Sequence, residues 1–149
     1  MNQQLSHLGA LVLCCLLAAC SPNPAPNTNL VSDALFDQGW QFFRSEKVLD
    51  LAAAQQQTVW EKISIPHTPK IEPLVVNAQF QGDAWYKKTI TTEPAWKGKH
   101  IRLKFESAMN VAEVWLNGKK LTTHVGGYLP FSVDLTQQLN WDAPNELMV

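Results

Sequence analysis

The stretch that decides the fold is Val111–Leu135, VAEVWLNGKKLTTHVGGYLPFSVDL. Residues 111–116 alternate along the chain with a period of two, which is typical of a strand. Asn117-Gly118 supplies the two residues with positive φ that a type I′ turn requires, and a return strand begins at Lys119. The stretch therefore predicts a β-hairpin, which specifies geometry but no chemistry.

The residues that follow the hairpin predict a corner between two strands. Gly126-Gly127 can turn the backbone out of one strand and into another because glycine has no Cβ, and Pro130 cannot donate to a central ladder. Phe131, Val133 and Leu135 then fall on one face of the next strand. Such a corner suits a β-sandwich.

The motifs of this region, taken together, resemble a known family. The run V-W-L-N-G, the run H-x-G-G-Y-x-P-F beginning at His124, and the run V-D-L-T beginning at Val133 resemble the N-terminal sugar-binding domain of glycoside hydrolase family 2. That family contains β-galactosidases, β-glucuronidases and β-mannosidases. The resemblance covers about Trp40–Val149 and implies an all-β fold, an antiparallel jelly-roll-like β-sandwich of the galactose-binding kind, truncated at its C-terminus.

The composition limits which classes of partner the chain is expected to bind. It has 149 residues, with 12 Lys and Arg against 13 Asp and Glu, and it shows no basic stripe or acidic tail. This balance argues against nucleic acid and favours a neutral partner. The six Trp, six Phe and two Tyr suit a β-rich core, and exposed aromatic rings could stack on sugars.

The N-terminus resembles the signal of a bacterial lipoprotein. Leu8–Ala19 is apolar, too short to span a bilayer of about 30 Å as a helix, and of the length of a signal-peptide core. The small residues before Cys20 resemble a lipoprotein cleavage site, which implies that Cys20 is acylated and becomes the first mature residue. An ordinary cleaved signal peptide is the alternative.

Three segments follow from this interpretation. Residues 1–19 are expected to be a lipoprotein signal peptide, and residues 20–34, which contain Pro22, Pro24 and Pro26, a flexible tether. Residues 35–149 are expected to form the sugar-binding β-sandwich, incomplete at its C-terminus. The expected location is the bacterial cell envelope, with the protein lipid-anchored on the periplasmic side or at the outer membrane.

Further segments are expected along residues 35–149. They are an aromatic strand at Trp40–Phe43, a strand at Val59–Ile65, a loop at Glu72–Phe80, a strand at Ile101–Phe105 and a strand at Asn145–Val149. Glu46–Gln57 suits a turn of helix and equally an irregular surface segment.

Four residues are candidates for contact with a sugar. The segment I-P-H-T resembles the family motif P-H-T-W, with Pro69 in place of the usual Trp. His67 is therefore either a contact near the sugar site or domain interface, or a loop histidine bonded to a backbone carbonyl, which we favour. The run G-x-x-W-Y-K-K resembles a family strand after the loop that reaches toward the active centre. It makes Gln81, Asp83 and Trp85 candidates, although Asp83 after a glycine equally suits a turn.

The sequence predicts no catalytic residue, cofactor or metal site. Retaining glycosidases need two carboxylates about 5 Å apart, and no such pair is recognisable; the resemblance implies that both catalytic glutamates lie in a barrel outside this chain. His67, His100 and His124 lack the spacing of a metal site. Lys97, Lys99, Arg102 and Lys104 could suggest an anion site, but their alternation favours a solvated strand face.

The preferred function is the sugar-binding and scaffolding domain of a family 2 enzyme that hydrolyses O-glycosyl bonds, with a β-galactosidase as the first choice. The implied partners are a β-galactoside-type glycan, a membrane reached through a lipid anchor at Cys20, and C-terminal domains of the same enzyme. One alternative is a stand-alone carbohydrate-binding surface lipoprotein without catalysis. Another is a structural or adhesive β-sandwich with no sugar role.

Overall fold

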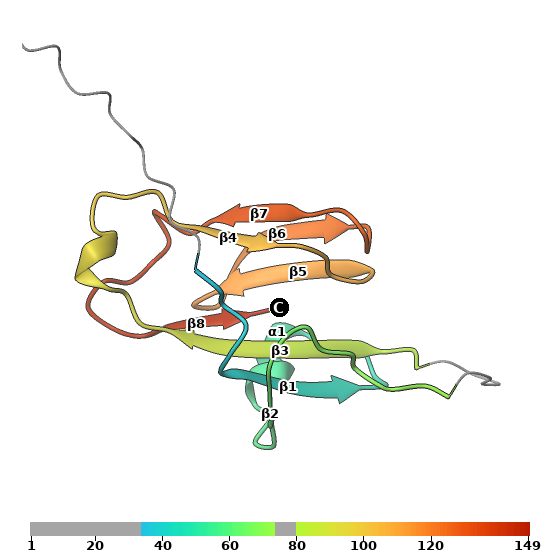
Figure 1. Ribbon diagram of the computed structural model, residues 1–149. Helices are drawn as coiled ribbons and strands as arrows, with labels where there is room; N and C mark the ends of the chain where they lie inside the picture. Colours follow the sequence, from blue (N-terminus) through green and yellow to red (C-terminus); the bar gives the residue numbers. More distant parts are fainter. Residues whose placement is uncertain (1–33, 74–79) are drawn as a thin grey trace, which may run out of the picture. The chain divides into compact units, whose positions relative to one another are not determined.

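Strands form most of the regular structure in the computed structural model, which describes residues 34–73 and 80–149 (Figure 1). They are β1 (Trp40–Ser45), β2 (Glu61–Ile63), β3 (Asp83–Ile90), β4 (Arg102–Phe105), β5 (Val111–Leu116), β6 (Lys119–Val125), β7 (Phe131–Asp134) and β8 (Asn145–Met148). A short helix, α1 (Leu51–Gln55), and a 3-10 turn, η1 (Pro94–Trp96), are also described. The predicted signal peptide, Cys20 and nearly all of the predicted tether lie outside the described residues.

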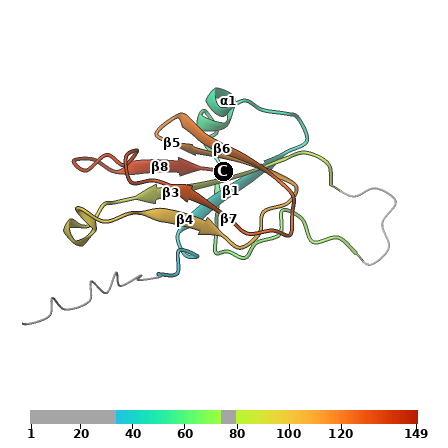
Figure 2. The same cartoon turned by 90° about the horizontal axis from the view of Figure 1, so that it is seen from above.

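The strands pair antiparallel in two sheets, which confirms the predicted class of fold. The six-stranded sheet has the order β2-β1-β3-β8-β5-β6, and the second sheet consists of β4 and β7, side by side in both views (Figures 1 and 2). Strand β8 is hydrogen-bonded to β3 on one side and to β5 on the other. It therefore joins two groups of strands that are separate along the chain.

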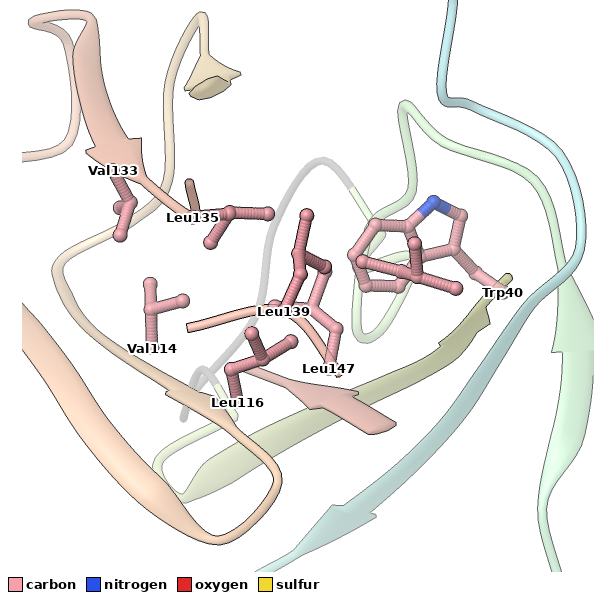
Figure 3. Close-up of a cluster of buried hydrophobic side chains, with 8 residues drawn as sticks. Trp40, Val114, Leu116, Val133, Leu135, Leu139 and Leu147 are labelled. Carbon is pink, nitrogen blue, oxygen red and sulfur yellow. The ribbon is translucent and has the colours of Figure 1, made fainter. Parts of the chain in front are cut away.

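The main core lies between the two sheets. Its buried members are Trp40, Ile90, Val114, Leu116, Val133, Leu135, Leu139 and Leu147 (Figure 3). Val133 and Leu135 belong to the face predicted after the double-glycine corner, and Phe131 packs against the same cluster. Leu116 and Leu147 are almost fully buried, and each contributes about 1.5–3 kcal/mol through the hydrophobic effect.

A second apolar cluster occupies the opposite face of the six-stranded sheet. Alternation along a strand sends Leu147 to the main core and Met148 to this second cluster, together with Trp85 and the helical residue Ala54. Asp50 caps the N-terminus of helix α1, where its carboxylate accepts a hydrogen bond from the backbone N–H of Ala53 over 2.8 Å. The turn of helix, one of the two alternatives for Glu46–Gln57, is therefore present and covers apolar side chains.

The hairpin and the corner have the predicted geometry. Asn117 and Gly118 have φ values of 52° and 79°, which are the signs that a type I′ turn requires. Gly126, with a φ of 123°, takes the chain from β6 of the large sheet toward β7 of the small one. A Cβ on Gly127 would lie 2.7 Å from Cγ of Met109, so a larger residue there would displace that side chain.

A buried asparagine organises the approach to β8. Asn145 is 0% exposed, and its Oδ1 accepts hydrogen bonds from Nδ2 of Asn117 over 2.8 Å and from the backbone N–H of Asn140. Its Nδ2 donates to the carbonyl of Asn140 over 2.9 Å. One side chain thus connects the hairpin turn with the segment that precedes β8.

The strand predicted at Val59–Ile65 is shorter than expected. Only Glu61–Ile63 pair with β1, while Val59 is 80% exposed. The backbone N–H of Ile65 donates to the carbonyl of Asp37 over 2.9 Å, outside the ladder between β1 and β2. The apolar alternation of the sequence therefore continues past the end of the paired segment.

Candidate functional site

A hollow of about 510 Å³ lies beside β1, where its pairing with β2 ends. Strand β2 pairs with β1 only as far as Phe42, so the next residues of β1 have no β2 partner. The segment 67–71 borders this free end. The lining consists of Phe42, Phe43, Arg44, Val59, Glu61, His67, Thr68, Pro69, Lys70 and Ile71.

One wall of the hollow is an aromatic group. The ring centroid of Phe42 lies 4.5 Å from that of His67 and 5.0 Å from that of Tyr86. Nδ1 of His67 is hydrogen-bonded to the hydroxyl of Tyr86 over 3.2 Å. Burial raises the pKa of Tyr86 to about 12, so the phenol stays protonated at neutral pH. With Nδ1 engaged, Nε2 is the ring nitrogen of His67 that remains for a ligand.

This arrangement corrects one expectation for His67. The imidazole was expected to be bonded to a backbone carbonyl, whereas its partner is the hydroxyl of Tyr86. His67 and Tyr86 are 19 residues apart in sequence, and the sequence gives no direct sign of such a contact. The histidine lines the hollow, and its contact with a sugar or a neighbouring domain stays a prediction.

Arg44 is a lining residue that the sequence did not mark as a candidate. Its Nη1 donates to the carbonyl of Pro69 over 2.9 Å, and its guanidinium carbon lies 5.7 Å from the centroid of the Phe80 ring. The other N–H groups of an arginine point outward in a fixed fork, which suits hydroxyl or carboxylate oxygens. The sequence signal was a basic residue directly after the aromatic pair Phe42-Phe43 in β1.

The remaining charges of this region are partly paired. Lys70 and Glu72 form an ion pair over 3.0 Å. The hydrogen bond from Lys70 is the main cause that lowers the pKa of Glu72, and the charge of Arg44 contributes to the same shift. Lys70 is therefore engaged, which leaves Arg44 as the more available cation.

Asp83 and Gln81 lie outside this lining. Oδ2 of Asp83 accepts a hydrogen bond from the backbone N–H of Leu49 over 2.8 Å, and Gln81 is exposed. Between them, a Cβ on Gly82 would lie 2.1 Å from the carbonyl oxygen of Ser45. Asp83 therefore has a role in holding the loop before α1, and a sugar contact by either side chain stays a prediction.

Trp85 lies in the second apolar cluster and not on the surface. It is 5% exposed, and its ring stacks on Trp115 with centroids 5.3 Å apart and lies parallel to Phe43 at 6.5 Å. A side chain in this position has no free ring face for a saccharide. Its role in the described structure is packing, in place of the stacking contact expected from the sequence.

The described residues also bear on metal binding and on membrane crossing. Within residues 34–73 and 80–149, no group of three or more His, Cys, Asp or Glu side chains is placed to hold a metal ion. In the same residues, no helix has the length and apolar content that a membrane crossing requires.

Comparison with known proteins gives consistent matches. The family profile described as "Glycosyl hydrolases family 2, sugar binding domain" matches residues 52–149. Beta-galactosidase BoGH2A of Bacteroides ovatus is 31% identical over 142 residues, which cover 89% of this chain and 16% of that protein. A beta-glucuronidase of Formosa agariphila is 30% identical over 124 residues, or 76% of this chain and 13% of the relative.

Solved structures show the same likeness. A crystal structure of Bacteroides uniformis beta-glucuronidase is 29% identical, with a TM-score of 0.66 over 76% of this chain and 14% of that one. The chain thus spans 13% to 16% of the length of these relatives.

Proposed function

Since this chain belongs to glycoside hydrolase family 2, with residues 52–149 matching the sugar-binding domain, we propose that it is the carbohydrate-recognising part of an enzyme that hydrolyses β-galactosides. The observation that supports direct sugar contact is the hollow beside β1, which brings an imidazole and a guanidinium together next to aromatic rings. The relative named a beta-galactosidase supports the choice of sugar.

The chemistry of the hollow suits a neutral saccharide. Sugar hydroxyls accept hydrogen bonds from guanidinium and imidazole N–H groups, and the apolar face of a pyranose packs against aromatic carbon. Arg44 on β1 and His67 on the segment after β2 both line the hollow and supply these donors. The carbonyl of Pro69 fixes the orientation of the guanidinium.

Calorimetric titration of the chain with β-1,4-galactobiose tests the proposal. Arg44→Ala should weaken binding by roughly tenfold, because one charged hydrogen-bond donor contributes about 1.5 kcal/mol. Arg102→Ala is a matched control, because it removes the other arginine of the chain from an exposed position on β4. Unchanged affinity in Arg44→Ala would place the sugar elsewhere.

We further propose that hydrolysis depends on residues outside this chain. These relatives are about six times as long as this chain, and the sequence contains no recognisable pair of catalytic carboxylates. Incubation of the chain with a chromogenic β-galactoside should therefore give no turnover. Hydrolysis that follows the purified chain through two chromatographic steps would contradict this assignment.

The N-terminal residues support a proposal about location. Residues 1–19 would be a signal peptide, Cys20 the acylated residue and residues 20–34 a tether that holds residues 35–149 at the bacterial cell envelope. Metabolic labelling with a palmitate analogue should mark the chain and place it in the membrane fraction. Cys20→Ser should abolish both results, whereas Cys15→Ser should change neither. Labelling that persists in Cys20→Ser would contradict the assignment.

A further inference from the structure

A second hollow lies at a different place in the fold, between the turn after η1 and the segment after β7. Its volume is about 630 Å³, and Lys97, Lys99 and His100 border it on one side. Gln137, Trp141 and Asp142 border it on the other. We call this the basic hollow. It shares no lining residue with the hollow beside β1.

The lysine side of the basic hollow is held by a tight turn before β4, so Lys97 and Lys99 do not belong to the strand face that the sequence favoured for them. The backbone N–H of Lys97 donates to the carbonyl of Pro94 over 3.2 Å, and that of Lys99 donates to Trp96 over 3.0 Å. Gly98, with a φ of 75°, lets the chain reverse between the two lysines. Trp96 packs against the main core, so the turn is anchored while both ammonium groups stay exposed.

The opposite side is anchored as well. The hydroxyl of Thr136 accepts from the backbone N–H of Ile101 over 2.9 Å, which ties the two sides together. The backbone N–H of Asp142 donates to the side chain of Asn140 over 3.0 Å, and Asn140 is itself bonded to the buried Asn145. The hydroxyl of Thr92 donates to the carbonyl of Trp141 over 3.3 Å. The hollow is thus largely formed before any ligand arrives.

The charges of the basic hollow are not balanced within it. Among the residues that the structure describes, neither Lys97 nor Lys99 forms an ion pair. Two ammonium groups therefore face one carboxylate, that of Asp142, with His100 beside them. Outside the lining, the hydrogen bonds from Thr136 and then the charges of Arg102 and His100 lower the pKa of Asp134, so a further carboxylate lies near His100. An anionic ligand fits this surplus.

The indole of Trp141 narrows the class of anion. Trp141 is half-buried in the lining and offers apolar surface next to the two cations. A pyranose ring that carries a carboxylate or sulfate matches both features, because its ring packs on aromatic carbon while its acidic group meets the lysines. We propose that the basic hollow binds an acidic sugar residue of a polysaccharide, independently of the hollow beside β1.

Titration of the chain with trigalacturonate, with galactotriose as the uncharged counterpart, tests this proposal. The double variant Lys97→Ala/Lys99→Ala should weaken trigalacturonate binding by about tenfold and leave the thermal midpoint unchanged, because both lysines are exposed. Lys47→Ala/Lys62→Ala is the matched control, since it removes two positive charges from exposed positions outside both hollows. Equal losses in the two double variants would overturn the proposal, as would no loss in the first.

Trp141→Ala separates an acidic sugar from other anions. It should weaken trigalacturonate binding by about fivefold but leave unchanged any association with phosphatidylglycerol vesicles, which need charge and no aromatic platform. Vesicle binding that depends on Lys97, Lys99 and Trp141 as strongly as sugar binding does would overturn the proposal in favour of a lipid headgroup site. Arg44→Ala should retain trigalacturonate binding, so this test and the test of the proposed function can fail separately.

Discussion

The side-chain amide of Asn117 donates a hydrogen bond to Oδ1 of Asn145 over 2.8 Å, and so connects the turn of the hairpin to the first residue of β8. The backbone of Asn117 also donates to the carbonyl of Glu146, whose N–H donates to Oδ1 of Asn117, both over 2.9 Å. The turn residue thus continues the pairing between β5 and β8 by one position. Asparagine serves here both for its positive φ and for its side chain.

Replacing Asn117 should separate these two roles. Asn117→Gly keeps a residue that tolerates positive φ but removes the side-chain hydrogen bonds, and should lower the free energy of unfolding by about 1–3 kcal/mol. Asn117→Ala should cost about 1 kcal/mol more, because alanine is strained at a φ of 52°. Urea denaturation measures both changes. Equal stability of the wild type and Asn117→Gly would show that only the backbone matters.

Asn145→Leu should be one of the most destabilising polar substitutions in the domain. It removes the buried acceptor of the Asn117 amide and of the Asn140 backbone, and leaves these groups without their partner. The expected loss is about 3 kcal/mol or more, measured by urea denaturation. Gln81→Leu, at an exposed position, is the control and should change stability by less than about 0.5 kcal/mol. A tolerated Asn145→Leu would contradict the role assigned to this side chain.

Two glycines should respond differently to alanine. At Gly82 a Cβ would lie 2.1 Å from the carbonyl oxygen of Ser45, so β1 and β3 must move apart locally. At Gly98 nothing lies within 4 Å, and the cost is the backbone strain of a φ of 75°, about 1 kcal/mol. The thermal midpoint of Gly82→Ala should therefore be lower than that of Gly98→Ala. The reverse order would mean that the chain before β3 adjusts freely.

Tyr86 should make stability depend on pH in the alkaline range. Burial raises the pKa of its phenol to about 12, whereas an unfolded tyrosine titrates near pH 10. Between these values the unfolded state binds fewer protons, so the free energy of unfolding falls as the pH rises. Urea midpoints measured at pH 8 and pH 11 test this. Between the two pH values, the wild type should lose more stability than Tyr86→Phe does. A difference between the two proteins that does not change with pH would contradict the assignment.

Local turn chemistry made the hairpin and the corner predictable. Asn117-Gly118 and Gly126 carry backbone requirements that few other residues meet, and the structure has the corresponding positive φ values. The placement of β8 between β3 and β5 was not predictable in the same way. It depends on pairing between residues far apart in sequence, such as Lys87 with Met148, which no local pattern encodes.

The candidate site was less accessible to prediction for two physical reasons. Trp85 belongs to a strand with apolar clusters on both faces, so alternation could not tell a buried ring from an exposed one. Arg44 and His67 come together only because β2 stops early and the segment after it passes the end of β1. A sequence motif can point to one of these residues, but the hollow that both of them line is formed by the tertiary structure.

The central position of β8 also determines when the six-stranded sheet can be completed during synthesis of the chain. Until Asn145–Met148 has cleared the exit tunnel, the segments that contain β3 and β5 have no shared neighbour. A nascent chain therefore holds side chains such as Trp85 and Leu116 away from their final surroundings until residues 145–148 are available. A pause in translation before residue 145 would prolong that vulnerable interval, and chaperones that shield apolar segments would act there.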